Sequence, residues 1–519
     1  MSEKMTIRLG CWLVLFIGLV VAAMPARAQD SLERWSPPLN LGKGWWQSVT
    51  TDSQGNLHVG WYNGIGVEGT AFDFLTYAQR RLDGTWSEPN EVIFTTTGGY
   101  TVRNALAVTS NGRIFSVHRN EIAHFLSSSV VAAADNASTW SEPTRISSSG
   151  YYVDMLADRN DNLHIVFSGT VDTLAPPPGG GNPEASICAY CQDLFYRRST
   201  DQGASWSDPY PLSIEVATGS DRMNIIQGDS GRLYIFWDEG YDWYIGKGQA
   251  QDVRFVYSLD QGETWSEPII IDGGGFSDRR PIQIAMTETR DGSLMVIWRY
   301  SNDTDRGIYY QISSDLGQTW TARQPIPGIV ARYTNDTPLD DFDLITDRLG
   351  NIHAFVVAQP NLLSTANAGL YHITYQQGEW LAPQRVFYSP IMRPEWPKVA
   401  LGPSNDIHLT WFIRGIRENL SGQQDATGIL EVFYSHLDGN LQPEPTREFL
   451  PTNTPLPTAT IFLNLDPTLT PFPTLEGIDP NLALVTMDTY GSTAVLGGLF
   501  TSAIFCLAVA VGLRFWRRL

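Results

Sequence analysis

The sequence predicts an all-β protein, a single β-propeller of about seven blades, and three observations support this prediction. Gly, Trp, Tyr and Phe are abundant, with 46, 17, 21 and 22 copies, whereas charged residues make up only 17% of the chain. This composition favours pleated strands joined by tight turns over helices. Two short turn motifs also recur along the chain, and the spacing of the first is typical of propeller blades.

The first motif is a turn followed by an apolar strand. Residues 55–61, with the sequence GNLHVGW, are its fullest copy. Successive copies lie roughly 50 to 70 residues apart, as the repeats of a propeller do. The seven copies begin at Gly55, Gly112, Asp161, Gly231, Gly292, Gly350 and Asn405.

The second motif alternates with the first and reads Ser-x-Asp-x-Gly-x-Ser/Thr-Trp. Residues 199–206, 258–265 and 313–320 are near-complete copies. Weaker copies end at Trp86, Trp140 and Trp380. This motif is the Asp box, and across residues of about 35 to 450 the chain resembles the sialidase-type β-propellers with BNR repeats. The resemblance implies four-stranded blades around a central axis. It also makes a six-bladed, sialidase-like ring the alternative to the seven repeats.

The Asp box indicates structure rather than catalysis. Its aspartate can accept N–H bonds within a turn, and the glycine supplies a backbone conformation that other residues resist. The final tryptophan can pack between turn and strand. We assign this structural role to Asp201, Asp260, Asp315, Trp206, Trp265 and Trp320.

Four histidines follow the first motif at one repeated position. They are His58, His164, His353 and His408. Phe, Tyr and Met fill the same position in the other repeats, so the position favours bulk over metal binding. No metal or cofactor is predicted.

The two ends of the chain predict export and anchoring. Residues 1–28 have the basic start, apolar run and Ala-Arg-Ala site of a signal peptide. Residues 491–513 contain an uncharged run long enough for a transmembrane helix, and the arginines of residues 514–519 favour a cytoplasmic tail. Pro and Thr recur over residues 451–490, which predicts an extended stalk. The propeller, residues 29–450, would then lie outside the cell.

Charge and cysteine content narrow the partners. A formal net charge of −20 argues against nucleic acid as the main partner. Cys188 and Cys191 are the cysteines of the predicted ectodomain, and in an oxidising compartment they predict a local disulfide. A zinc site would need a second pair of ligands.

Strand order locates the expected binding face. We call the strands of a blade A to D, from the axis outward. If the first motif joins A to B and the Asp box joins C to D, both turns lie at one end, the turn end. The long loops, including residues 169–191, 238–251 and 414–428, then lie at the opposite, loop end. Binding sites concentrate on such loops, and the sialidase resemblance implies a substrate pocket there.

Nine residues before each turn, strand A should begin at the mouth of the central channel. The seven positions are Trp46, Arg103, Tyr152, Arg222, Gln283, Asp341 and Trp396, which we call the mouth ring. Arg280 or Arg279 is an alternative to Gln283. Because arginine suits carboxylates and aromatic faces suit sugars, the ring is predicted to bind a planar or acidic sugar. The predicted binding residues are Trp46, Arg103, Tyr152, Arg222, Asp341 and Trp396. The alternative is an Arg–Asp network that plugs the channel.

The resemblance also implies a chemistry, in which three arginines hold a carboxylate, a Tyr–Glu pair supplies the nucleophile and an Asp is acid and base. The catalytic candidates are Arg103, Arg222, Arg280, Asp341 and Glu395, with Arg119, Arg299 and Arg393 as further arginines. Further acids are Asp154, Asp221, Asp278 and Glu239, and the tyrosines are Tyr62, Tyr152, Tyr241 and Tyr333.

Two function classes remain open. We expect a membrane-anchored propeller that binds glycan or another cell-surface ligand without cleaving it. An active sialidase or other glycoside hydrolase is the alternative.

Ring closure also has two solutions. Residues 35–41 could complete the last blade beside residues 430–435, and residues 441–449 compete for that place.

Overall fold

The structure is a computed structural model of an all-β chain. It describes residues 35–64, 73–96, 103–169, 192–213, 218–241, 249–273, 280–301, 303–332, 341–364, 367–418, 424–439 and 441. The predicted signal peptide, stalk, membrane helix and tail, together with Cys188 and Cys191, lie outside these residues. Within them, no helix has the length and apolar character needed to cross a membrane.

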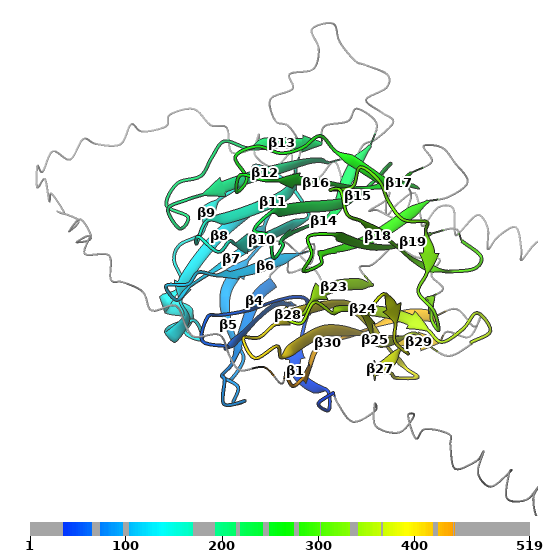
Figure 1. The fold of residues 1–519 in the computed structure, drawn as a ribbon. Coiled ribbons are helices and arrows are strands. Elements are labelled where there is room, and N and C mark those ends of the chain that lie inside the picture. The colour runs from blue at the N-terminus through cyan, green and yellow to red at the C-terminus, as the bar shows by residue number, and fades with distance from the viewer. Residues whose placement is uncertain are drawn as a thin grey trace, which may run out of the picture. The chain divides into compact units, whose positions relative to one another are not determined.

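Seven antiparallel sheets are arranged around a centre (Figure 1), so the prediction of seven blades is confirmed. The innermost strands, strand A of each blade, are β2 (Trp45–Thr51), β6 (Asn104–Val108), β10 (Val153–Ala157), β14 (Gly219–Gln227), β18 (Pro281–Glu288), β23 (Phe342–Thr346) and β28 (Met392–Leu401). The B strands are β3 (Leu57–Gly64), β7 (Arg113–Asn120), β11 (Leu163–Gly169), β15 (Leu233–Tyr241), β19 (Leu294–Tyr300), β24 (Ile352–Gln359) and β29 (Ile407–Glu418).

The outer half of each blade follows the same order. The C strands are β4 (Asp73–Arg80), β8 (Ala123–Val130), β12 (Asp193–Ser199), β16 (Gln249–Ser258), β20 (Ile308–Ser313), β25 (Gly369–Gln376) and β30 (Gln424–Leu437). The outermost strands are β5 (Asn90–Thr95), β9 (Thr144–Arg145), β13 (Tyr210–Ser213), β17 (Ile269–Gly273), β21 (Gln324–Pro325), the pair β26 (Glu379–Trp380) and β27 (Gln384–Phe387), and β1 (Leu39–Lys43). Short additions are β22 (Val330–Ala331) beside β24 and two 3-10 turns, η1 (Val131–Ala133) and η2 (Ala137–Thr139).

The N-terminal strand closes the ring. β1 pairs antiparallel with β30, and Leu39 lies opposite Tyr434. Figure 1 shows this blue strand against the gold end of the chain. The first and last blades also exchange hydrogen bonds at the axis, because the Gln47 amide donates to the Trp396 carbonyl at 2.6 Å and the Trp396 indole donates to the Gln47 carbonyl at 3.0 Å. The first of the two closure solutions is therefore the one adopted.

The hydrophobic core consists of seven clusters, each of which lies between two neighbouring blades. Four B strands place a fully buried tryptophan at their fifth residue. These are Trp61, Trp237, Trp298 and Trp411. Each blade thus buries its apolar faces against its neighbours, which is why a single blade would not be stable alone.

The Asp boxes join each blade to the preceding one at the turn end. The Asp260 carboxylate accepts the Thr264 amide at 2.9 Å and the Ser258 hydroxyl at 2.8 Å. Trp265 then packs edge-on against Tyr196 of the preceding blade, with ring centroids 4.8 Å apart. Equivalent contacts surround Asp201 and Asp315, and Trp206 and Trp320 pack in the same sense.

The turn-motif histidines have a second role besides bulk. His164 Nε2 lies 3.2 Å from the Asp158 carboxylate, and its Nδ1 lies 2.6 Å from the Tyr196 hydroxyl. Asp52, His58 and Tyr77 repeat this arrangement in the first blade. The spacing of Asp and His, six residues apart in both blades, is a sequence signal that the interpretation as simple bulk missed.

Candidate functional site

Four members of the mouth ring lie on β-bulges with left-handed backbone conformations. Their φ values are 53° at Trp46, 54° at Arg222, 61° at Gln283 and 58° at Trp396. In each case the register with strand B shifts at that point. Left-handed conformations cost roughly 1–3 kcal/mol for such residues, and bulges re-aim side chains. Four left-handed residues therefore share one level of the channel.

Neighbouring blades satisfy the polar groups that the bulges leave unpaired. The Asp238 carboxylate accepts the amides of Gln283 at 2.8 Å and Ile284 at 3.1 Å. The Arg103 guanidinium donates to the Met223 carbonyl, two blades away, at 2.7 Å. The bulge at Gln283 is thus held by the adjacent blade, and Arg103 joins the second blade to the fourth.

Arg103 covers the aromatic faces of the ring. Its guanidinium lies 4.8 Å from the Tyr152 ring centroid and 4.3 Å from that of Trp396. Trp46 packs edge-on against Trp396 at 4.8 Å. Because Arg103, Tyr152 and Trp396 are all buried, the faces that were predicted to meet a sugar are occupied by the protein itself.

Four other arginines near the loop end form ion pairs with carboxylates. Arg222 lies 3.4 Å from Asp238, and Arg332 lies 2.7 Å from Asp341. Glu395 receives both Arg393 at 3.0 Å and Arg414 at 3.1 Å. We call this group the arginine–carboxylate cluster, and its geometry is that of the network predicted as the alternative to an open site.

Two further catalytic candidates lie in or beside this cluster. Arg299 donates to the Gln283 amide oxygen at 2.7 Å, and burial lowers the pKa of its guanidinium to about 10. Arg280 is half-buried at the start of β18, and its carbonyl accepts the Ser301 amide.

Asp221 is a buried carboxyl group of this region that holds no other group in place among the described residues. Its side chain is 5% exposed, and it lies opposite Asp238 in the β14–β15 register. Among the described residues, no hydrogen bond or ion pair reaches its carboxyl oxygens. Burial raises its pKa to about 8, with Arg222 opposing the shift and Glu239 and Asp238 reinforcing it. Asp221 can therefore hold a proton at neutral pH.

Glu239, beside it, differs in being fully bonded. Its carboxylate accepts hydrogen bonds from Thr218 at 2.5 Å, Ser220 at 2.8 Å and the Trp237 indole at 2.8 Å. Burial raises the pKa of Glu239 as well. Its contacts give it a role in holding β14 against β15.

The tyrosine candidates do not form a nucleophile pair in the described part of the chain. The Tyr62 hydroxyl is buried, donates to the Arg103 carbonyl at 3.0 Å and accepts the Arg119 amide at 3.0 Å. Burial raises the pKa of Tyr62 far above the ordinary value. Tyr333, Asp278, Arg279 and the side chain of Tyr241 lie outside the described residues. The described residues also hold no cluster of three or more groups suited to a metal ion.

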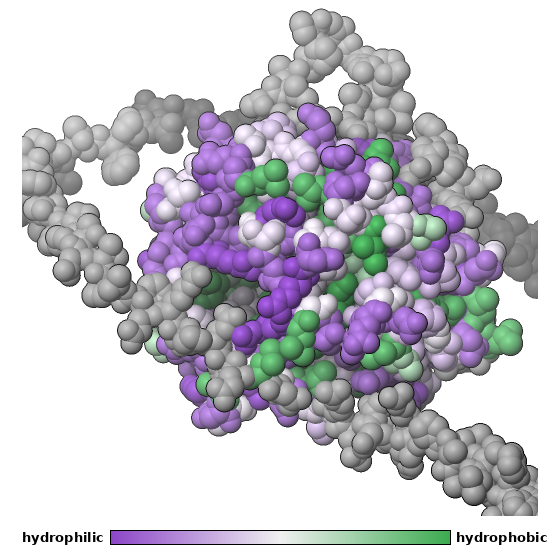
Figure 2. All heavy atoms as spheres, in the orientation of Figure 1, coloured by the Kyte–Doolittle hydropathy of each residue, from purple (hydrophilic) through white to green (hydrophobic). Residues whose placement is uncertain are grey.

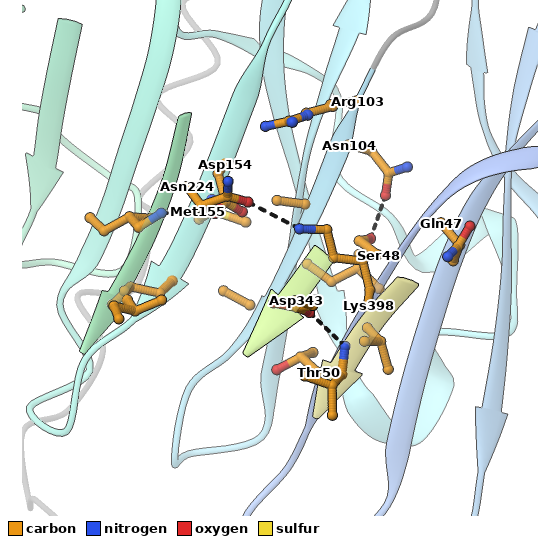
Figure 3. A pocket seen from close by; sticks show the side chains of 18 of the residues that line it. Gln47, Ser48, Thr50, Arg103, Asn104, Asp154, Met155, Asn224, Asp343 and Lys398 are labelled. Carbon is orange, nitrogen blue, oxygen red and sulfur yellow. Dashed lines mark hydrogen bonds between the residues drawn. The ribbon is translucent and has the colours of Figure 1, made fainter. Parts of the chain in front are cut away.

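Below the mouth ring, the channel widens into a cavity of ≈ 330 Å³ that residues of all seven A strands line. We call it the channel cavity. Figure 3 shows Lys398 reaching into it, with its ammonium 3.0 Å from the Asn224 amide oxygen. Asp154 and Asp343 also line the cavity, and each accepts a backbone amide of the next blade at 2.9 Å. Figure 2 shows hydrophilic residues, in purple, across the middle of the molecular face that it presents.

The cavity lies between the ring and the turn end. Its upper wall is formed by buried ring residues, namely Arg103, Gln283, Asp341 and Trp396. At its lower rim, Thr51, Ala157 and Ile226 are half-buried. The space therefore communicates with the turn end more readily than with the mouth at which the sequence placed the site.

Comparison with known proteins shows which families this chain is similar to. The model of the BNR repeat-like domain matches residues 182–336. An anhydrosialidase of Macrobdella decora is 26% identical over 145 residues, which cover 26% of this chain and 17% of the leech protein. The chain thus matches less than a fifth of that relative's length.

Two solved structures share the fold. An ulvan lyase of polysaccharide lyase family PL25, bound to -[GlcA(1-4)Rha3S]-, is 12% identical with a TM-score of 0.51, covering 72% of this chain and 92% of that one. The polysaccharide lyase Uly1 is 11% identical with a TM-score of 0.50, covering 79% and 100%. These two likenesses show the propeller fold, and the seven blades, the BNR repeat-like match over residues 182–336 and the leech relative together support a sialidase-like β-propeller with BNR repeats.

Proposed function

We propose that the protein is a membrane-anchored, extracellular propeller that binds an acidic glycan at its loop end without cleaving it. The observation that carries this proposal is the pairing of the arginines in the cluster with Asp238, Asp341 and Glu395. A site that captures and cleaves a sialoside would need several guanidinium groups directed at one carboxylate. Here the paired arginines instead form a rigid, polar layer at the loop end.

The ligand class is supported by the sialidase likeness and by the arginines that gather close to the axis. Arg103 lies over the Tyr152 and Trp396 rings, and Arg222 lies 3.4 Å from Asp238. Such groups favour a negatively charged sugar over a neutral one.

The test is glycan-array binding by the purified full-length chain. We expect saturable binding to acidic glycans that falls at least about tenfold in Arg222→Ala. The matched control is Arg159→Ala, because Arg159 is an exposed arginine at the turn end. Melting curves show whether each variant is folded. Binding to no glycan by the folded wild type, or equal loss in both variants, contradicts the proposal.

A second candidate, a glycan-cleaving enzyme, is favoured by Asp221. A buried carboxyl with a pKa of about 8 is suited to donate a proton to a leaving group at neutral pH. Fluorogenic sialosides and uronides test this candidate. Turnover that disappears in Asp221→Asn but persists in Asp83→Asn, an exposed turn substitution, would support cleavage over binding alone.

A further inference from the structure

We propose that the channel cavity is a second binding site, which takes a small zwitterionic α-amino acid from the turn end. This inference does not rest on the proposed glycan function, which concerns the loop end. It rests on the size of the cavity, the charges fixed in its wall and its access.

The volume suits one small molecule. At ≈ 330 Å³ the cavity lies near the lower limit of small-molecule sites, which span about 300–1,000 Å³. Its wall comes from rigid, mutually packed A strands rather than from loops, so the site is preformed.

Lys398 supplies the positive group. Its ammonium has three protons to donate. In the described part of the chain, the Lys398 ammonium makes one hydrogen bond, to Asn224. No carboxylate oxygen of these residues lies within the 4.0 Å that defines an ion pair. Two N–H donors are therefore left for an occupant of the cavity (Figure 3).

Asp154 and Asp343 supply the negative groups, from the third and sixth blades. Burial raises the pKa of both, and the charge of Lys398 opposes that shift more than any other group does. The pKa of Asp343 is about 6, so its carboxylate is charged at neutral pH. Each carboxylate accepts two backbone amides, those of Met155 and Ile225 at Asp154 and those of Leu344 and Val399 at Asp343. Because a carboxylate has about four lone-pair sites, each group keeps acceptor capacity for an occupant.

The Lys398 ammonium and the two carboxylates share a cavity without contacting one another, and partly desolvated charges are costly when unpaired. A small ligand that carries both a negative and a positive group could therefore bind between them. An α-amino acid matches this pattern: its carboxylate accepts from Lys398, and its ammonium donates to Asp154 and Asp343. A neutral sugar would leave the charges unmatched. A simple cation would be repelled by Lys398.

The test is titration calorimetry of the full-length chain with glycine, alanine and serine, and with glucose and putrescine as comparison ligands. We expect the amino acids to bind and the comparison ligands not to. Binding should weaken at least about tenfold in Lys398→Met, which keeps the length of the side chain but removes the charge.

A second variant keeps the result interpretable if Lys398→Met is unstable. Ala157→Phe narrows the half-buried rim and should also abolish binding, whereas Ala204→Phe, the same change at an exposed Asp-box position, should not. The proposal is overturned if no amino acid binds at about 10 mM, if glucose or putrescine binds equally well, or if Ala157→Phe retains wild-type affinity. Retained binding in Asp221→Asn would place the ligand in the channel rather than at the loop end.

Discussion

The two ends of the propeller solve the problem of polar groups differently. At the turn end, short local networks repeat from blade to blade, as around Asp201, Asp260 and Asp315, and each group finds its partners within a few residues. At the loop end, Arg222, Asp341 and Glu395 are partnered across strands or blades, and no two blades use the same pairing. Repetition thus marks the structural end, and irregularly paired, buried charge marks the end that is available for function.

The largest expected effect concerns the turn end. Gly262 has a φ of +81°, and a Cβ there would lie 1.9 Å from the Tyr196 hydroxyl. Gly262→Ala should lower the free energy of unfolding by roughly 3 kcal/mol, measured by urea denaturation. Gly231→Ala is the control, because φ is +85° but nothing lies within 4 Å. Gly231→Ala should lower the free energy of unfolding by only about 1 kcal/mol. Equal losses in the two variants would contradict the idea that Gly262 is needed for close packing between blades.

The next effect contrasts two aspartates at the loop end. The folded-state pKa of Asp221 is raised, so the folded chain holds a proton that the unfolded chain releases, and stability falls as pH rises from about 4 to 8. Asp221→Asn should therefore raise the melting temperature, with a gain that grows as the pH rises over this range, since each pKa unit corresponds to about 1.4 kcal/mol. Asp238→Asn should instead destabilise, because Asp238 holds two amides and Arg222. A pH-independent gain in Asp221→Asn would contradict the assigned protonation.

A smaller effect tests the contacts that join Asp158, His164 and Tyr196, which we call the histidine relay. Tyr196→Phe removes the hydroxyl that lies 2.6 Å from His164 Nδ1 and should cost about 1–2 kcal/mol in chemical denaturation. Tyr310→Phe is the matched control, since the Tyr310 hydroxyl makes an exposed contact of 3.3 Å with Gln324. If both variants lose the same stability, the relay adds nothing beyond packing.

The smallest effect is expected at Arg159. Its ion pair with Asp229 joins two side chains that are each 52% exposed, and such pairs contribute about 0–1 kcal/mol. Arg159→Ala should leave the melting curve nearly unchanged, which is what qualifies it as a control for the glycan experiment.

The fold could be predicted because its information is local and repeated. The turn motif counted seven blades, and a count of nine residues back from each turn reached Trp46, Arg222, Gln283 and Trp396, the four residues now found on left-handed bulges. The six-residue spacing of Asp158 and His164 is also visible in the sequence. The sequence does not show that Tyr196, on the next strand, contacts the other ring nitrogen of His164.

The site was harder to predict because its partners are not periodic. Nothing in the sequence pairs Arg222 with Asp238, or stacks Arg103 on Tyr152 and Trp396. The first contact depends on the bulged register of two strands in one blade, and the others depend on how several blades meet around the axis. The same limit applies to Lys398, which reaches Asn224 in another blade across 174 residues. Spacing from the turns predicted that arginines and aromatics would gather at the mouth, but not that they would cover one another.

Closure by β1 has a consequence for the order in which the molecule folds. Ser36 and Ser435, which meet in the last blade, are 399 residues apart, so this contact carries a large loop-closure cost and should form late. Until then, β30 presents an open sheet edge to its surroundings. A β1 segment from a second copy could fill that edge as well as its own. Refolding at high concentration should therefore trap strand-exchanged dimers, and refolding at high dilution should yield monomers.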